Sequence, residues 1–204
     1  YSISHDLRGP LRGIDGWSQA LLEDCADRLD DSGRTYLSRV RAETQRLGLL
    51  IDELLQLSRL TQAEIRHSPV DLSSLVDTIV RQLRASDSAR RVEVRIQPDL
   101  RTDGDEALLR TALACLLDNA WKFSAKRDPA VIEFGRDVST EPAAYYVRDN
   151  GAGFDMTYVG KLFAPFQRLH KGAEFPGNGI GLAKAHRVIR RHGGRIWAEA
   201  RVGQ

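Results

Sequence analysis

Residues 105–123 read DEALLRTALACLLDNAWKF, an amphipathic stretch that predicts one long helix. Segments of other periodicity flank this helix on both sides. Asp71–Ala85 has a helical pattern with Asp71 as the expected N-cap, and Gly179–His192 predicts a last helix. Alternating apolar residues predict strands at Val92–Ile96, Ala130–Gly135, Ala144–Arg148 and Ile196–Ala200. Mixed helices and strands in this order predict a two-layer α/β sandwich.

The first 67 residues have a different pattern, with apolar residues at spacings of three and four. Such a seam predicts helices that pack against a partner helix. Asp30, Asp31 and Ser32 are N-cap candidates for a second helix, so we expect an antiparallel hairpin that dimerises into a four-helix bundle. The seam consists of Leu7, Leu11, Ile14, Leu21 and Cys25, followed by Leu37, Val40, Thr44, Leu47, Ile51 and Leu54.

The segment His67-Ser68-Pro69-Val70 breaks this pattern and is interpreted as a hinge. We therefore expect a dimerisation and phosphotransfer domain over residues 1–67 and a second, catalytic domain over residues 68–204.

Composition narrows the functional classes. Lys and Arg number 30 and Asp and Glu number 28, a balance that argues against a nucleic-acid-binding protein. Cys25 and Cys115 are far apart in sequence, which favours a reduced, cytoplasmic setting over a disulfide framework. No stretch of the sequence is apolar for long enough to span a bilayer. The five histidines form no pattern typical of a metal site.

One candidate nucleophile lies near the start of the chain. His5 comes two residues before Leu7, so it projects from the side of the seam. A neutral imidazole is a competent nucleophile for phosphorus, and Asp6 is placed to hold the proton on its other nitrogen. Pro10 removes a backbone donor and predicts a bend in the helix. By itself this dipeptide would be interpreted as a surface histidine beside an acid.

Two further motifs have the chemistry of a nucleotide site. Asn119 and Lys122 share a helix face, where an amide oxygen can bind Mg²⁺ and an ammonium can neutralise phosphate. Asp149 follows an expected strand and can accept a hydrogen bond from an exocyclic amine such as that of adenine. Gly151 and Gly153 permit close approach of the backbone to a ligand. Taken alone, the Asn119 and Lys122 pair would be interpreted as a polar stripe on a surface helix, and the sequence at Asp149 is also common in hairpin turns.

The last motif, GNGIGLA at residues 177–183, opens the final helix and exposes backbone N–H groups for phosphate. It fits neither a Walker A sequence nor a Rossmann fingerprint. Ahead of it, residues 163–169 read FAPFQRL, an aromatic loop suited to a mobile lid over a nucleotide.

Five features follow one another along the chain: the His5 helix, the Asn119 and Lys122 helix, the turn after Asp149, the aromatic loop and the glycine motif. In this order they resemble the catalytic core of two-component sensor histidine kinases. The resemblance covers essentially the whole chain, and the segments SHDLRGPLRGIDGWSQALLED and FQRLHKGAEFPGNGIGLA are similar to the subgroup linked to PAS and phytochrome sensory modules. It implies an α+β protein: an antiparallel helical hairpin that forms a dimeric four-helix bundle, followed by a two-layer α/β sandwich of the Bergerat (GHKL) type.

The resemblance also implies an activity. ATP would phosphorylate His5, with Asp6 orienting it, and the phosphate would pass to an aspartate of a response regulator receiver domain. Asn119 would bind Mg²⁺ and Lys122 the phosphates. Asp149 would bind adenine, with Gly151 and Gly153 beside the base. Gly177, Gly179 and Gly181 would border the phosphates, and Arg168 in the lid would contact either the phosphates or the other domain. The other partners implied are a second copy of the chain and an N-terminal sensory module before Tyr1.

Three positions depart from the family pattern. Cys115 stands where relatives often have a second asparagine, and is expected to serve packing. Gly9 stands where many relatives have a residue that aligns water for dephosphorylation, which predicts weak phosphatase activity. The sequence ends at Gln204, before the last strand expected of the family.

Two alternative functions compete with a kinase. A gyrase-type or Hsp90-type ATPase would need a glutamate at position 115 and would lack the histidine hairpin, so both features argue against it. A degenerate kinase that acts as a dimerisation or binding scaffold remains the alternative function.

Overall fold

The computed structural model describes residues 2–62, 64–169, 174–175, 177–201 and 203, without the side chains of residues 2–6 and 61–62. The chain divides into two compact units, Tyr1–Arg59 and Leu60–Gln204.

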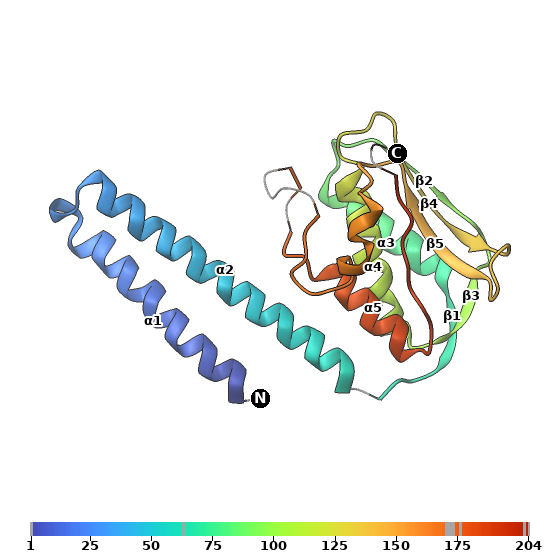
Figure 1. Ribbon diagram of the computed structural model, residues 1–204, viewed down its shortest axis with the longest axis horizontal. Coiled ribbons are helices and arrows are strands. Elements are labelled where there is room, and N and C mark those ends of the chain that lie inside the picture. Colours follow the sequence, from blue (N-terminus) through green and yellow to red (C-terminus); the bar gives the residue numbers. More distant parts are fainter. Residues whose placement is uncertain (1, 63, 170–173, 176, 202, 204) are drawn as a thin grey trace. The chain divides into compact units, whose positions relative to one another are not determined.

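The first unit is a hairpin of two long helices, as the seam predicts (Figure 1). Helix α1 (Ser2–Asp24) runs through Pro10, and a single 3₁₀ turn, η1 (Ala26–Arg28), connects it to α2 (Asp31–Gln62). The N-cap prediction is confirmed, because the Asp30 carboxylate accepts a hydrogen bond of 2.7 Å from the Gly33 N–H.

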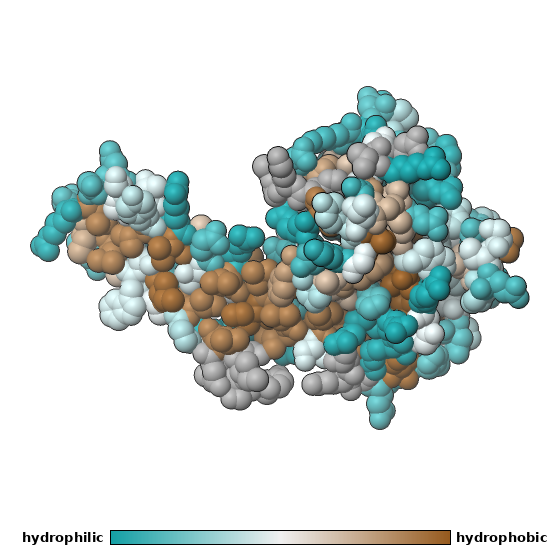
Figure 2. All heavy atoms as spheres, in the orientation of Figure 1, coloured by the Kyte–Doolittle hydropathy of each residue, from teal (hydrophilic) through white to brown (hydrophobic). Residues whose placement is uncertain are grey.

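Only half of the seam is covered inside the hairpin. Thr44 of the seam is buried, with 6% of its surface exposed, and so is Ser18, which lies between the seam positions Ile14 and Leu21 and is 5% exposed. The alternate seam positions, each seven residues from the next on the same helix, are 43–48% exposed, and apolar side chains gather along one face of the hairpin in Figure 2. These exposed positions are Leu7, Ile14 and Leu21 on α1, and Val40, Leu47 and Leu54 on α2.

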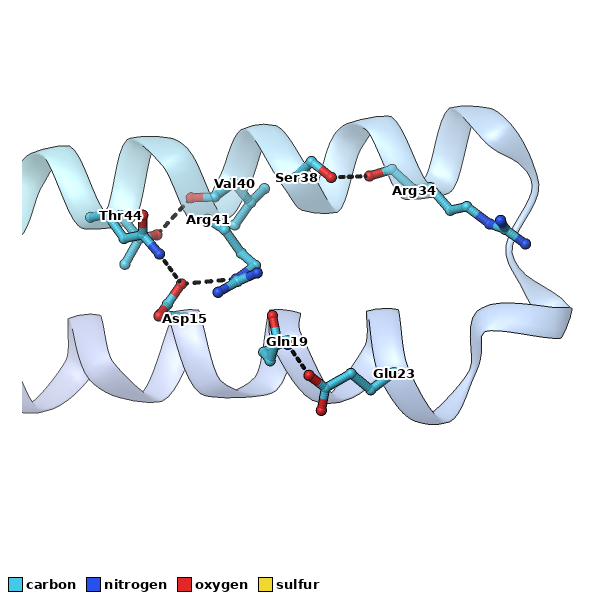
Figure 3. A network of polar contacts seen from close by, with 9 residues as sticks. Asp15, Gln19, Glu23, Arg34, Ser38, Val40, Arg41 and Thr44 are labelled. Carbon is cyan, nitrogen blue, oxygen red and sulfur yellow. Dashed lines mark hydrogen bonds and ion pairs between the residues drawn. The ribbon is translucent and has the colours of Figure 1, made fainter.

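A polar network links the two helices of the hairpin near its buried hydroxyls (Figure 3). The Asp15 carboxylate accepts hydrogen bonds from Arg41 Nε at 3.1 Å and from Gln45 Nε2 at 3.3 Å. The Thr44 hydroxyl donates to the Val40 carbonyl at 2.8 Å. Polar side chains between two helices find hydrogen-bond partners only when the helices are aligned in a particular register. These bonds therefore favour one register of α1 relative to α2.

The second unit is the predicted two-layer α/β sandwich. Strand β4 (Ala130–Asp137) lies at the centre of a three-stranded sheet. It pairs in parallel with β2 (Val92–Ile96) and antiparallel with β5 (Ala144–Asp149). Helices α3 (Leu72–Ser86), α4 (Glu106–Phe123) and α5 (Gly181–Arg191) form the second layer (Figure 1). Between the layers lies an apolar core whose most deeply buried side chains include Val76, Leu117 and Ile132.

Two aspartates set where the helices of this layer begin. Asp71 accepts a hydrogen bond of 2.9 Å from Ser74 N, which confirms it as the N-cap of α3. Asp105 caps α4 in the same way, with 3.1 Å to Leu108 N. Backbone N–H donors of the first helical turn hold the pKa of both carboxyls below the ordinary value.

Two local predictions were wrong. The expected hinge at His67–Val70 is largely a strand, because Ser68–Asp71 forms β1, which pairs antiparallel with β3 (Arg101–Gly104). The expected strand at Ile196–Ala200 forms no ladder. Instead, Ile196 packs against a small apolar cluster on α4 and α5 without strand pairing, while the neighbouring Trp197 is exposed. Among the described residues, no helix has both the length and the apolar character of a membrane span.

Candidate functional site

Several candidate site residues lie on or beside the last two turns of α4. The Lys122 ammonium donates a hydrogen bond of 3.3 Å to the amide oxygen of Asn119, and both side chains are half-buried. Earlier on the same helix, Cys115 lies against the first residue of α5: a Cβ added to Gly181 would be 3.7 Å from the Cys115 Cβ. This contact, within the small apolar cluster, agrees with the expected packing role of Cys115.

The glycine-rich turn before α5 runs close to Lys122. Gly177 has a φ of +141°, and a Cβ there would be 3.2 Å from the Lys122 Nζ. Gly179 has a φ of +72°, and a Cβ there would be 2.7 Å from the Gln167 carbonyl oxygen. Only glycine combines these backbone angles with this proximity. The Gly179 carbonyl also accepts a hydrogen bond of 2.8 Å from Phe166 N, which ties the turn to the aromatic loop.

A second cation, Arg168, acts on Lys122 through its charge. Arg168 donates a hydrogen bond of 2.6 Å to the carbonyl of Phe175, whose buried ring lies edge-on to Phe123 at 5.0 Å between centroids. Burial lowers the pKa of Lys122 most, Asp118 opposes this, and the charge of Arg168 lowers it further. The site therefore concentrates positive charge that neighbouring groups only partly balance.

The candidate carboxylate, Asp149, lies at the end of β5, where a turn fixes it against α4. Its Oδ1 accepts a hydrogen bond of 2.9 Å from Gly151 N, and Ala152 N donates to the Phe123 carbonyl at 3.1 Å. A Cβ on Gly151 would be 2.6 Å from that carbonyl oxygen, and Gly153 has a φ of +60°. Gly151 therefore has no room for a side chain, and the backbone angle of Gly153 favours glycine.

The second oxygen of Asp149 is available to a ligand. Within the part of the chain that the structure describes, Oδ2 has no hydrogen-bond partner. Burial raises the pKa of the Asp149 carboxyl, and the Gly151 N–H partly opposes the shift. A half-buried carboxylate with one open oxygen is an acceptor for a single N–H group.

Arg127 supports this turn, and sequence reasoning missed it. Its Nε and Nη2 donate to the Gly151 carbonyl at 3.3 and 2.9 Å. The Asn150 side chain adds a bridge, since it accepts from Val131 N and donates to Pro129 O, each at 2.9 Å. Arg127 lies in an irregular loop after α4, where no periodicity or motif distinguishes it from a solvated arginine.

The structure thus brings the nucleotide-site candidates together in one unit. His5 and Asp6 lie in α1 of the other unit, and their side chains fall outside the described residues. Their roles therefore stay predictions.

Two family models match the chain. Residues 1–63 match the His Kinase A (phospho-acceptor) domain. Residues 104–204 match the Histidine kinase-, DNA gyrase B-, and HSP90-like ATPase.

Individual proteins are similar over the whole chain. Cyanobacterial phytochrome B of Nostoc sp. is 35% identical over 207 residues, covering 100% of this chain and 27% of that protein. Phytochrome-like protein Cph1 of Synechocystis sp. is 28% identical over 206 residues, with the same two coverages. Among solved structures, full-length ShkA in complex with AMPPNP has a TM-score of 0.63 at 24% identity, covering 100% of this chain and 42% of that one, a likeness of fold. The chain spans about a quarter of the length of these two curated relatives.

Proposed function

This chain belongs to the sensor histidine kinases, as a catalytic core of that family, and we propose that it uses ATP to phosphorylate its own His5. The phosphate then passes to an aspartate of a response regulator receiver domain. The observation that supports this most is the pair of cations, Lys122 and Arg168, beside the glycine turn at Gly177.

These two cations suit the phosphates of ATP. Burial lowers the pKa of Lys122 most, and the charge of Arg168 lowers it further, so both the half-buried setting and the second cation disfavour the charged lysine. A triphosphate would replace this repulsion with attraction and would accept hydrogen bonds from both side chains. Phosphoryl transfer depends mainly on positioning and charge neutralisation, which such a pair supplies.

The base and the phosphates would then occupy neighbouring parts of the site. Asp149 Oδ2 would accept a hydrogen bond from the exocyclic amine of adenine, with the ring against Gly151 and Gly153. The turn from Gly177 through Gly179 to Gly181 would place backbone N–H groups toward the phosphates at the start of α5.

The residues present fit a magnesium ion held mainly by ATP. Asn119 Oδ1 is a hard oxygen donor at the phosphate end of the site, 3.3 Å from the Lys122 Nζ. Cys115, one turn earlier, faces Gly181 and offers no oxygen. When bound, Mg²⁺ would neutralise charge on the phosphate oxygens, while Asn119 holds it through one ligand and Lys122 contributes a second positive charge.

In the transfer step, one nitrogen of neutral His5 would attack the γ-phosphorus, and the bond from this phosphorus to the bridging oxygen of ADP would break. Asp6 would hold the proton on the other nitrogen and stabilise the positive charge that develops on the ring.

The exposed half of the seam supports a homodimer. A second copy would cover the positions that are 43–48% exposed in one hairpin and so complete a four-helix bundle. On this proposal residues 1–67 form the dimerisation and phosphotransfer domain and residues 68–204 the ATP-binding domain, in the cytoplasm, with a sensory module preceding both.

Labelled ATP tests the proposal directly. Incubation with Mg²⁺ and γ-labelled ATP should give an acid-labile, base-stable phosphate on the protein. His5→Ala should abolish the label, whereas His67→Ala, a matched change at an exposed histidine, should retain it. Label that persists in His5→Ala would refute the assignment, and an unlabelled wild-type protein would favour the scaffold alternative.

A further inference from the structure

The segment that leads from α2 into β1 is packed onto the ATP-binding unit. Leu60 and Ile65 contact the small apolar cluster of Leu108, Ala112, Ala185 and Val188 on α4 and α5. Arg191, at the end of α5, donates a hydrogen bond to the Leu60 carbonyl. Residues 64–67, here called the linker, have no secondary structure of their own, so their path depends on such contacts.

One carboxylate joins the linker to the helix of the nucleotide site. Asp105 Oδ1 accepts from Leu108 N at 3.1 Å and so caps α4. Its Oδ2 accepts from the linker amide of Arg66, also at 3.1 Å. Both are backbone donors to a charged acceptor, the kind of hydrogen bond that contributes most to local stability.

The backbone of Asp105 is held in turn by α5. Its N–H donates to His192 Nε2 at 3.0 Å, while His192 Nδ1 lies 2.9 Å from the Val188 carbonyl. Nδ1 therefore donates and Nε2 accepts, which is the arrangement of a neutral imidazole. The backbone of Asp105 is thus fixed by α5, while one carboxylate oxygen accepts a hydrogen bond from the linker and the other accepts one from α4.

We propose that Asp105 is a positioning residue that anchors the linker to the N-terminus of α4, the helix of Asn119 and Lys122. This rests on the proposed function, because the linker connects the His5 hairpin to that helix. The anchor fixes where the chain leaves the ATP-binding unit and leaves the nucleotide contacts untouched. Its loss should therefore slow transfer to His5 without weakening ATP binding.

Asp71 provides a matched control. It caps α3 through the same type of bond, 2.9 Å to Ser74 N, and has no hydrogen bond to the linker within the described part of the chain. A serine retains N-cap ability but is too short to reach a second donor on another segment. Asp105→Ser and Asp71→Ser therefore change the cap alike, while only the first removes the anchor.

Tryptic cleavage after Arg66, followed by mass spectrometry on the native chain, measures the anchor itself. We expect roughly fivefold faster cleavage in Asp105→Ser than in wild type, the change expected for one lost hydrogen bond, and an unchanged rate in Asp71→Ser. Asp105→Asn should behave like Asp105→Ser, because an asparagine retains the cap and loses one acceptor oxygen. Equal cleavage in all variants, with their melting temperatures matched, would overturn the proposal.

The kinetic comparison uses label incorporation at varied ATP. Asp105→Ser should lower the rate at saturating ATP by roughly threefold with the KM for ATP unchanged, the split expected when binding is preserved. A KM that rises in parallel would mean that α4 itself has moved and would count against the anchor. If wild type takes up no label, the proposed function fails, while the cleavage rates still decide whether Asp105 holds the linker.

Discussion

Arg127 donates two hydrogen bonds, at 3.3 and 2.9 Å, to the carbonyl of Gly151. Gly151 belongs to the turn that positions Asp149. The relationship is indirect, because Gly151 in turn donates to the Asp149 carboxylate at 2.9 Å. An arginine in the loop after α4 therefore sets the geometry of a carboxylate at the end of β5.

Replacing Arg127 should weaken nucleotide binding without changing the transfer step. Arg127→Met removes both donors at similar volume, at a cost of about 1 kcal/mol or somewhat more. We expect a KM for ATP raised by roughly tenfold and a kcat within about twofold of wild type. Arg127→Lys should recover part of the loss. The measurement is the initial rate of label incorporation over a range of ATP, and a fall in kcat at constant KM would contradict the role.

Asp149→Asn should raise the thermal stability of the protein while abolishing ATP binding. Burial raises the pKa of this carboxyl above its ordinary 3.8, so the folded state binds the proton more tightly than the unfolded state. Stability therefore decreases as pH rises from about 3.8 through the raised pKa, and the cost is fully present above it. The asparagine removes this cost, so Tm at pH 7 should rise by ~2 °C, with no gain at pH 3, while ATP binding is lost. Thermal melts at both pH values, with ATP titration calorimetry, provide the check.

The glycine turn offers a test of backbone strain. Gly179→Ala places a side chain at a φ of +72° and against the Gln167 carbonyl, so it should displace the turn and lower ATP affinity by roughly tenfold. Gly160→Ala is the control, since nothing lies within 4 Å of its added Cβ. Nucleotide binding in Gly160→Ala should equal wild type. Equal affinity in both variants would remove the turn from the site.

Two exposed leucines of α2 test the dimer. Leu47 lies on the seam and is 47% exposed, while Leu49 is 59% exposed two residues further along. Two residues turn a helix by about 200°, so the two side chains point in nearly opposite directions. Leu47→Lys should give a monomer in light scattering coupled to size exclusion, whereas Leu49→Lys should remain dimeric. A dimer in both variants would place the interface elsewhere.

Gly9 allows a gain-of-function test. A Cβ added there has nothing within 4 Å among the described residues, so the start of a side chain is accommodated on α1. If a missing side chain limits dephosphorylation of the receiver domain, Gly9→Thr should raise that rate several-fold while label on His5 forms as before. The readout is loss of phosphate from a purified, phosphorylated receiver domain. Equal rates in the two proteins would show that position 9 is not limiting.

The sequence predicted the elements that long patterns define. Helix α4 and the cap at Asp71 were predicted because apolar periodicity and N-cap chemistry are local properties. Strands β1 and β3 were missed, since four residues that include Pro69 or Gly104 show too little alternation. Ile196–Ala200 was wrongly predicted as a strand, because alternation describes a side-chain pattern and a strand also needs a neighbour to pair with.

Some residues of the candidate site could likewise be predicted from the sequence, and others could not. Asn119, Lys122 and Asp149 were chosen for their chemistry, and the structure places the first two in contact. Arg127 and Phe175 could not be found, because their importance lies in backbone carbonyls and rings that are distant in sequence. The same limit applies to the linker bond of Asp105, which joins residues 39 positions apart.

The half-burial of Lys122 and Asp149 also bears on the range of pH over which the proposed site would bind nucleotide. Burial lowers the pKa of the lysine and raises that of the aspartate, so the two values move toward each other. On the proposed function, nucleotide recognition needs the Lys122 ammonium protonated and the Asp149 carboxylate ionised at once. We therefore expect the interval of pH that satisfies both conditions to be shorter at each end than two surface residues would allow, with less nucleotide bound outside it.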